Sequence, residues 1–125
     1  MSASLALLLC EDMIFTSRIT GTGHALGLIV KPARTLDALK SLARTETPSC
    51  VMIDLSFPGL QIVELIQHLG ETLPAMPRIV AYGSHVDAAG LRAARDAGCD
   101  VVLPRSKFVE ELPRALPEWL APHGR

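Results

Sequence analysis

Five short runs of apolar residues recur along the chain at fairly even intervals. None of them alternates apolar and polar residues, as a strand with one face in water would. Continuous apolar strands are typical of a parallel sheet whose two faces are both covered by helices. The pattern therefore predicts five buried parallel strands, at residues 5–10, 28–30, 50–53, 79–81 and 101–103.

The segments between these runs have the spacing and the end signals of helices. Thr35 and Asp87 can each cap a helix through a side-chain oxygen, and Gly98 is suited to end one. We expect helices at residues 14–25, 35–43, 59–69 and 87–97, and a last helix from residue 107. This last helix should kink or restart near Pro113, because a proline in a helix interior costs about 3 kcal/mol.

Alternating strands and helices predict an α/β fold with a doubly wound, five-stranded parallel sheet between two layers of helices. The flavodoxin-like version of this (βα)5 fold has the strand order 2-1-3-4-5. A chain of 125 residues has the length of one domain. We therefore expect a single domain over residues 1–125, with no output domain.

Composition narrows the classes of function. Lys and Arg number 12 against 13 Asp and Glu, which gives a net charge of −1, and aromatic residues make up 4% of the chain. Direct binding of nucleic acid is not expected, because it usually needs a basic excess or a stacking platform. No apolar run has the length of a membrane span. Three cysteines without metal-ligand spacing suit reduced thiols in a cytoplasmic protein.

Polar residues that follow the predicted strands mark the edge where ligands bind in an open α/β sheet. Lys31 and Pro32 follow the second strand, whereas Glu11 and Asp12 follow the first and Asp54 follows the third. The first and third strands are neighbours at the switch point, so the three carboxylates should meet in one crevice. A divalent cation relieves their repulsion, and Mg²⁺ prefers such oxygen ligands. An acidic turn at this place argues against a dinucleotide-binding fold, which needs glycines there.

With these residues in place, the chain resembles the receiver domains of bacterial two-component response regulators over essentially its whole length. The segment VMIDLSFPG at residues 51–59 is similar to the phosphoacceptor strand of that family and the Pro-Gly turn behind it. The pair at residues 11–12 matches the acidic pair of the family, and residues 97–100 resemble its step into the fifth strand.

The resemblance implies a role in a phosphorelay for the acidic residues. Asp54 would be the phosphoacceptor, so that the chain would be a phosphoprotein. Glu11, Asp12, Asp54 and the backbone carbonyl of Ser56 would hold Mg²⁺. The chemistry is coherent, because a carboxylate can attack a phosphoryl donor while a metal ion neutralises charge on the transferring group.

Three positions depart from the pattern of the family. Its members have a Thr or Ser at the end of the fourth strand, where this chain has Gly83, with Ser84 one residue further on as the other candidate. They have a Lys at the end of the fifth strand, where this chain has Arg105, and a switch aromatic where it has Val102. Arginine is no simple replacement for lysine, because its planar fork favours carboxylates. The changes favour a degenerate pseudo-receiver, in which Arg105 pairs with Asp54.

Other residues bear on partners. His85 follows the fourth strand and is a candidate for modulating phosphate loss or for contacting a partner. Arg92 and Arg95 lie on the fourth predicted helix, and a solvated face explains them as well as an interface does. In the resembling family the surface of the fourth helix, fifth strand and fifth helix is the output face. The resemblance implies a histidine kinase or another signalling protein as partner, and it leaves dimerisation through that face open.

Three functions remain open from the sequence. The first is a stand-alone, degenerate receiver that acts through protein–protein contacts. The second is a receiver that is still phosphorylated on Asp54 with Mg²⁺. The third, a small Mg²⁺-dependent phosphatase, is disfavoured because Ser56 stands where the haloacid-dehalogenase-like phosphatases have a second Asp. We expect no enzyme activity beyond self-phosphorylation at Asp54.

Overall fold

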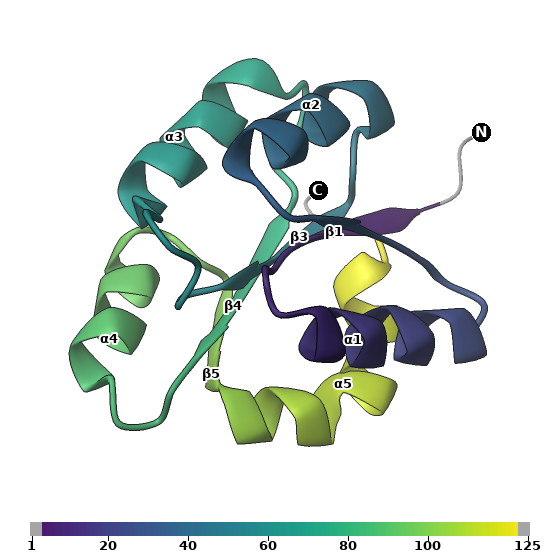
Figure 1. Cartoon of the computed structure of the whole chain (residues 1–125). Helices are drawn as coiled ribbons and strands as arrows, with labels where there is room; N and C mark the ends of the chain where they lie inside the picture. Colours follow the sequence, from purple (N-terminus) through teal and green to yellow (C-terminus); the bar gives the residue numbers. More distant parts are fainter. Residues whose placement is uncertain (1–3, 123–125) are drawn as a thin grey trace.

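Strands and helices alternate regularly along the chain in the computed structural model, which describes residues 4–122 (Figure 1). The strands are β1 (Leu5–Leu9), β2 (Ile29–Ala33), β3 (Cys50–Asp54), β4 (Arg78–Gly83) and β5 (Val101–Pro104). The helices are α1 (Met13–Ala25), α2 (Leu36–Glu46), α3 (Ile62–Thr72), α4 (Ala88–Asp96) and α5 (Arg105–Leu120).

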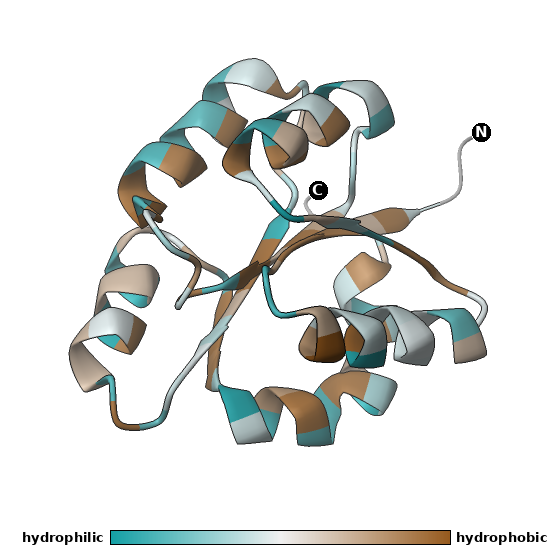
Figure 2. Cartoon of the chain, in the orientation of Figure 1, coloured by the Kyte–Doolittle hydropathy of each residue, from teal (hydrophilic) through white to brown (hydrophobic). Residues whose placement is uncertain are grey.

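All pairs of neighbouring strands are parallel, and their order is β2-β1-β3-β4-β5. Helices α1 and α5 cover one face of the sheet, and α2, α3 and α4 cover the other (Figure 1). The predicted fold class, a doubly wound (βα)5 sheet of flavodoxin-like strand order, is confirmed. Figure 2 shows the apolar residues concentrated on the central strands, as burial of both sheet faces requires.

The core consists of two layers, because successive residues of a strand point to opposite faces. In β1, Leu7 and Leu9 pack under α2 and α3, whereas Ala6 and Leu8 pack under α1 and α5. The layer under α1 and α5 also holds stacked aromatic rings. Phe108 lies 4.4 Å from Tyr82 and 5.7 Å from Trp119, measured between ring centroids.

The second strand is longer than predicted. Lys31 and Pro32 do not follow it but lie inside it, in register with Leu7 and Leu8 of β1. A proline is tolerated here because β2 is the edge strand and needs hydrogen bonds on one side only. The Lys31 ammonium pairs with Glu46 at 3.1 Å. Lys31 and Pro32 therefore do not belong to the ligand-binding edge.

The last helix differs most from its prediction. It begins at Arg105 and runs unbroken to Leu120, so the expected start at residue 107 and the restart near Pro113 are wrong. Both Pro113 and Pro117 lie on the exposed face of α5. The opposite face is buried in the core through Phe108, Leu112, Ala115, Leu116, Trp119 and Leu120. Burial of six side chains outweighs the cost of the prolines.

The helix caps agree with the sequence. The side chains of Thr35 and Asp87 each accept an N–H at the start of α2 and α4. Gly98 follows α4 with a φ of 107°, a conformation that favours glycine. Among the described residues, no helix combines the length and the apolar character needed to cross a bilayer.

Candidate functional site

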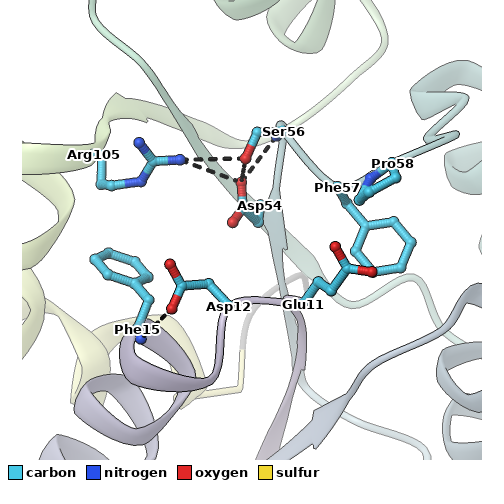
Figure 3. Close-up of a pocket in the computed structure, with 8 residues that line it drawn as sticks. All are labelled: Glu11, Asp12, Phe15, Asp54, Ser56, Phe57, Pro58 and Arg105. Atoms are coloured by element: carbon cyan, nitrogen blue, oxygen red, sulfur yellow. Dashed lines mark hydrogen bonds and ion pairs between the residues drawn. The ribbon is translucent and has the colours of Figure 1, made fainter.

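The carboxyl edge of the sheet carries an acidic cavity of about 370 Å³ between β1, β3 and α5 (Figure 3). Glu11 and Asp12 reach it from the loop after β1, Asp54 from the last position of β3, and Arg105 from the first turn of α5. The lining residues are Glu11, Asp12, Phe15, Asp54, Ser56, Phe57, Pro58 and Arg105. The structure thus brings the three predicted carboxylates to one cavity.

Asp54 is the centre of the cavity and the one buried charged residue of the described chain, with 5% of its surface exposed. Its Oδ1 accepts the backbone N–H of Ser56 at 2.9 Å and the Ser56 hydroxyl at 2.6 Å. Its Oδ2 accepts the thiol of Cys10 at 3.7 Å. A buried carboxyl group without such donors would be costly, so these contacts hold the side chain in place.

Arg105 supplies the positive charge beside Asp54. Its Nη2 lies 3.6 Å from Asp54 Oδ1 and donates to the Ser56 hydroxyl oxygen at 3.3 Å. Its guanidinium also lies over the rings of Phe15 and Tyr82, at 5.7 and 6.0 Å from their centroids. Flat rings favour a guanidinium above them. The expected pairing of Arg105 with Asp54 is therefore present. The two aromatic rings stabilise the guanidinium by cation–π contacts.

The other two carboxylates differ in orientation. The Asp12 side chain points into the cavity, and its Oδ1 accepts the N–H of Phe15 at 3.0 Å, which caps α1 (Figure 3). The Glu11 carboxylate points away from Asp12 and Asp54, toward the ring of Phe57 (Figure 3). Within residues 4–122 no three His, Cys, Asp or Glu side chains are grouped as a metal site requires. The oxygen donors suit Mg²⁺ in kind, but this arrangement does not gather them around one point.

Gly83 ends β4 beside β5, in register with Pro104. A Cβ at this position would lie 3.3 Å from Cδ1 of Leu55 and 3.5 Å from Cδ2 of Leu91. A threonine would therefore crowd two apolar side chains. Ser84 lies outside the acidic cavity, and its hydroxyl accepts the N–H of Val86 at 3.3 Å.

The predicted interface residues lie apart from Asp54. His85 is exposed in the loop between β4 and α4. Val102 is half-buried in β5 and packs on the core layer under α2, α3 and α4. Arg92 and Arg95 are exposed on α4, and neither makes an ion pair within the described residues.

Cys10, Phe15 and Tyr82 belong to the site although sequence reasoning gave them no role there. The register Leu9 with Ile53 brings Cys10 next to Asp54, so knowledge of the strand pairing would have found it. Phe15 lies in the first turn of α1 and points at Arg105. Burial raises the pKa of the Tyr82 phenol far above its usual value, with contributions from Cys10 and Asp54. The phenol therefore stays neutral behind the guanidinium.

Solved structures of response regulators share this fold. The signal receiver domain of a response regulator from Bermanella marisrubri superimposes with a TM-score of 0.82 at 21% identity, over 96% of this chain and 100% of that one. NtrX from Brucella abortus gives a TM-score of 0.80 at 16% identity over 95% of this chain. The chain spans 27% of the length of NtrX.

A third similar structure is a response regulator from Burkholderia pseudomallei with a phosphorylated aspartic acid, a calcium ion and citrate. It gives a TM-score of 0.72 at 20% identity over 92% of this chain and 69% of that one. No protein-family model and no curated protein matches the sequence. The chain therefore has the fold of response-regulator receiver domains.

Proposed function

We propose that the chain is a degenerate receiver, a signalling module that acts through protein–protein contacts without phosphorylation. The observation that carries this proposal is the position of Arg105. Its guanidinium supplies a positive charge 3.6 Å from Asp54. Asp54 is the carboxylate at the centre of the cavity.

Electrostatics supports this proposal. Three carboxylates around one cavity repel each other unless a cation lies among them. Here a cation of the chain itself lies there, fixed by Ser56 and by the rings of Phe15 and Tyr82. A nucleophilic carboxylate needs a free oxygen that faces its phosphoryl donor. Oδ1 of Asp54 accepts two hydrogen bonds from Ser56 and lies 3.6 Å from the Arg105 guanidinium, and Oδ2 faces the thiol of Cys10.

The expected partner is another signalling protein, such as a histidine kinase. The receiver-domain fold supports a signalling role, and the exposed residues Arg92 and Arg95 of α4 would lie at a contact surface. The proposal includes a cytoplasmic location, where Cys10, Cys50 and Cys99 would stay reduced as the free thiols that they are. It includes no enzyme activity on other molecules.

Intact mass spectrometry tests the proposal. The chain is incubated with acetyl phosphate, with and without Mg²⁺, next to Asp54→Asn and Arg105→Lys variants. We expect no mass gain in the unmodified chain under either condition. A gain of one phosphoryl group that depends on Mg²⁺ and is absent from Asp54→Asn would overturn the proposal.

The Arg105→Lys variant separates two causes of an inert Asp54. Lysine carries a compact charge and lacks the planar fork of arginine. A mass gain in this variant alone would attribute the inertness to the Arg105 guanidinium. If neither protein gains mass, the orientation of Glu11 and the missing hydroxyl at Gly83 are the next causes to examine.

A receiver phosphorylated on Asp54 is the second candidate. It is favoured by the cavity that Glu11, Asp12 and Asp54 share. In this case those carboxylates and the Ser56 carbonyl would hold Mg²⁺, after rotation of the exposed Glu11 side chain, and the ion would neutralise charge on the phosphoryl group. The similar structure with a phosphorylated aspartic acid belongs to another protein at 20% identity. Self-phosphorylation would then be the one reaction of the chain.

A further inference from the structure

A second cavity lies on the other side of Arg105 from Asp54. Its volume is about 590 Å³, and it opens between α1, the loop after β4 and the start of α5. Its lining residues are Phe15, Arg18, Ser84, His85, Arg105, Ser106 and Val109. Phe15 and Arg105 also line the acidic cavity, so these two side chains form the wall between the two cavities.

The charge of this second cavity is opposite to that of the first. Arg18 comes from α1, His85 from the loop after β4 and Arg105 from α5, and no Asp or Glu is among the lining residues. Within residues 4–122, Arg18 and His85 have no ion-pair partner. Two arginines and a histidine from three separate elements thus line a cavity to which no lining residue adds a negative charge. Such a group of donors recognises phosphate well, because guanidinium binds two oxygens at once.

The start of α5 adds to the positive potential. The helix has 16 residues, its N-cap is Pro104, and no side chain caps its first N–H groups. Its first turn also contains no acidic residue. The first N–H groups of a helix and its dipole favour an anion, and Arg105 and Ser106 of this turn line the cavity.

We propose that this cavity binds a phosphate monoester. Arg18, Arg105 and His85 hold the dianionic phosphate, with the hydroxyls of Ser84 and Ser106 as further donors. The organic part lies against the ring of Phe15 and the side chain of Val109. The cavity of about 590 Å³ has room for such a group beside the phosphate, and Phe15 and Val109 give it an apolar wall. The site uses none of the acidic residues, and its occupation does not depend on the proposed function.

Sharing of Arg105 couples the two cavities. The guanidinium lies 3.6 Å from Asp54, has 39% of its side chain exposed and lines both cavities, so a ligand in the second cavity can reach it. A dianion in the second cavity competes with Asp54 for this one cation. Loss of the Asp54 charge should therefore strengthen binding, whereas loss of Arg18 should weaken it.

Titration of the ¹⁵N-labelled chain with phenyl phosphate tests the proposal by NMR. EDTA is present throughout, and phenyl phosphate is a poor phosphoryl donor, so binding is measured without phosphorylation of Asp54. We expect saturable shifts of the amide signals of His85, Ser106 and Lys107, with a Kd of about 1 mM. Arg18→Ala should weaken binding about tenfold, as loss of a charge-assisted hydrogen bond does.

Two further variants make the result specific. Arg92→Ala removes an exposed arginine of α4 that does not line the cavity, and it should leave the Kd unchanged. Asp54→Asn should tighten binding about threefold, the effect of releasing one partly exposed ion pair. Shifts that do not saturate, or equal weakening by Arg18→Ala and Arg92→Ala, would show general attraction to surface charge and overturn the proposal. A failure here would leave the acetyl phosphate result unaffected.

Discussion

Asp12 has two chemical roles at one position. Its carboxylate points into the acidic cavity, and the same carboxylate accepts the N–H of Phe15 at the start of α1. An aspartate at an N-cap stabilises a helix whether or not the cavity has a function. Mutation of Asp12 therefore has two effects, a weakened start of α1 and the loss of a carboxylate from the cavity.

A pair of variants separates the two roles of Asp12. Asp12→Ala removes the cap, and we expect the free energy of unfolding to fall by about 1 kcal/mol. Asp12→Asn keeps a side-chain oxygen for the cap and loses the charge, so its stability should stay close to that of the unmodified chain. Urea unfolding at pH 7 measures both.

Thr35→Ala is the matched control, because Thr35 caps α2 through the N–H of Ala38 at 3.0 Å and does not line the acidic cavity. Thr35→Ala should lower the free energy of unfolding by about as much as Asp12→Ala does. If Asp12→Ala were as stable as the unmodified chain, the cap would contribute nothing to the stability of α1.

At the scale of elements, α5 connects the site to the core. Its first residue is Arg105 at the cavity, and its later turns bury Phe108, Leu112 and Trp119 against the sheet. The position of the guanidinium is therefore set by the packing of the whole helix. Two exposed prolines, Pro113 and Pro117, lie inside this helix, where each removes a backbone N–H.

Pro113→Ala should stabilise the protein. Alanine restores an N–H that can bond to the carbonyl of Val109 and removes a steric clash, together worth about 3 kcal/mol. The unfolded chain gains conformational freedom worth up to about 1 kcal/mol in return. We expect the free energy of unfolding to rise by about 2 kcal/mol in urea titrations.

Arg114→Ala changes the neighbouring exposed residue of α5, whose ion pair with Glu111 has a distance of 3.9 Å. Such a surface pair contributes little, so this control should change stability by less than about 0.5 kcal/mol. A Pro113→Ala variant that is no more stable than this control would mean that α5 packs best with the local geometry that proline imposes.

The alternation of apolar runs and helical segments was enough to predict the fold. Apolar strands need cover on both faces, and this requirement alone defines a doubly wound sheet. The prediction failed for α5 because a local cost at Pro113 was weighed without the burial of the opposite face. It failed at Lys31 and Pro32 because edge strands accept residues that central strands exclude.

The site was predictable as far as strand ends determine it. The fold alone brings four residues together, because each stands at the end of a strand or within three residues of it: Glu11, Asp12, Asp54 and Arg105. The orientation of a side chain depends on its neighbours. The turn of Glu11 toward Phe57 and the contact of Cys10 with Asp54 could not be read from spacing.

At the scale of the whole molecule, cysteine thiols lie at both layers of the core, Cys50 buried and Cys99 half-buried. Cys50 packs under α1 and α5, and Cys99 packs against the layer under α2, α3 and α4. Burial raises the pKa of Cys50 to about 12 and that of Cys99 to about 11, from a usual value of 9.0. Arg78 lowers the pKa of Cys50 in part, and Asp100 raises that of both thiols.

These raised pKa values predict a loss of stability in mild alkali. The folded chain keeps both thiols protonated, whereas the unfolded chain ionises them from about pH 9. Ionisation therefore favours the unfolded state, and the stabilisation, complete below pH 8, falls as pH rises through 9 toward 11. Cys50 should lower the free energy of unfolding by up to about 1 kcal/mol per pH unit in that window, and the partly exposed Cys99 by less.

Urea unfolding between pH 8 and pH 10, with a reductant present, measures this slope. Cys50→Ala loses packing and is less stable at every pH, but its slope should be about half that of the unmodified chain. Cys99→Ala should show a smaller reduction, because this thiol is only partly buried. The double variant should be nearly flat from pH 8 to pH 9, above which the raised pKa of Tyr82 adds a slope of its own. A steep fall that persists in the double variant would assign the alkaline sensitivity to other groups and separate it from the two core thiols.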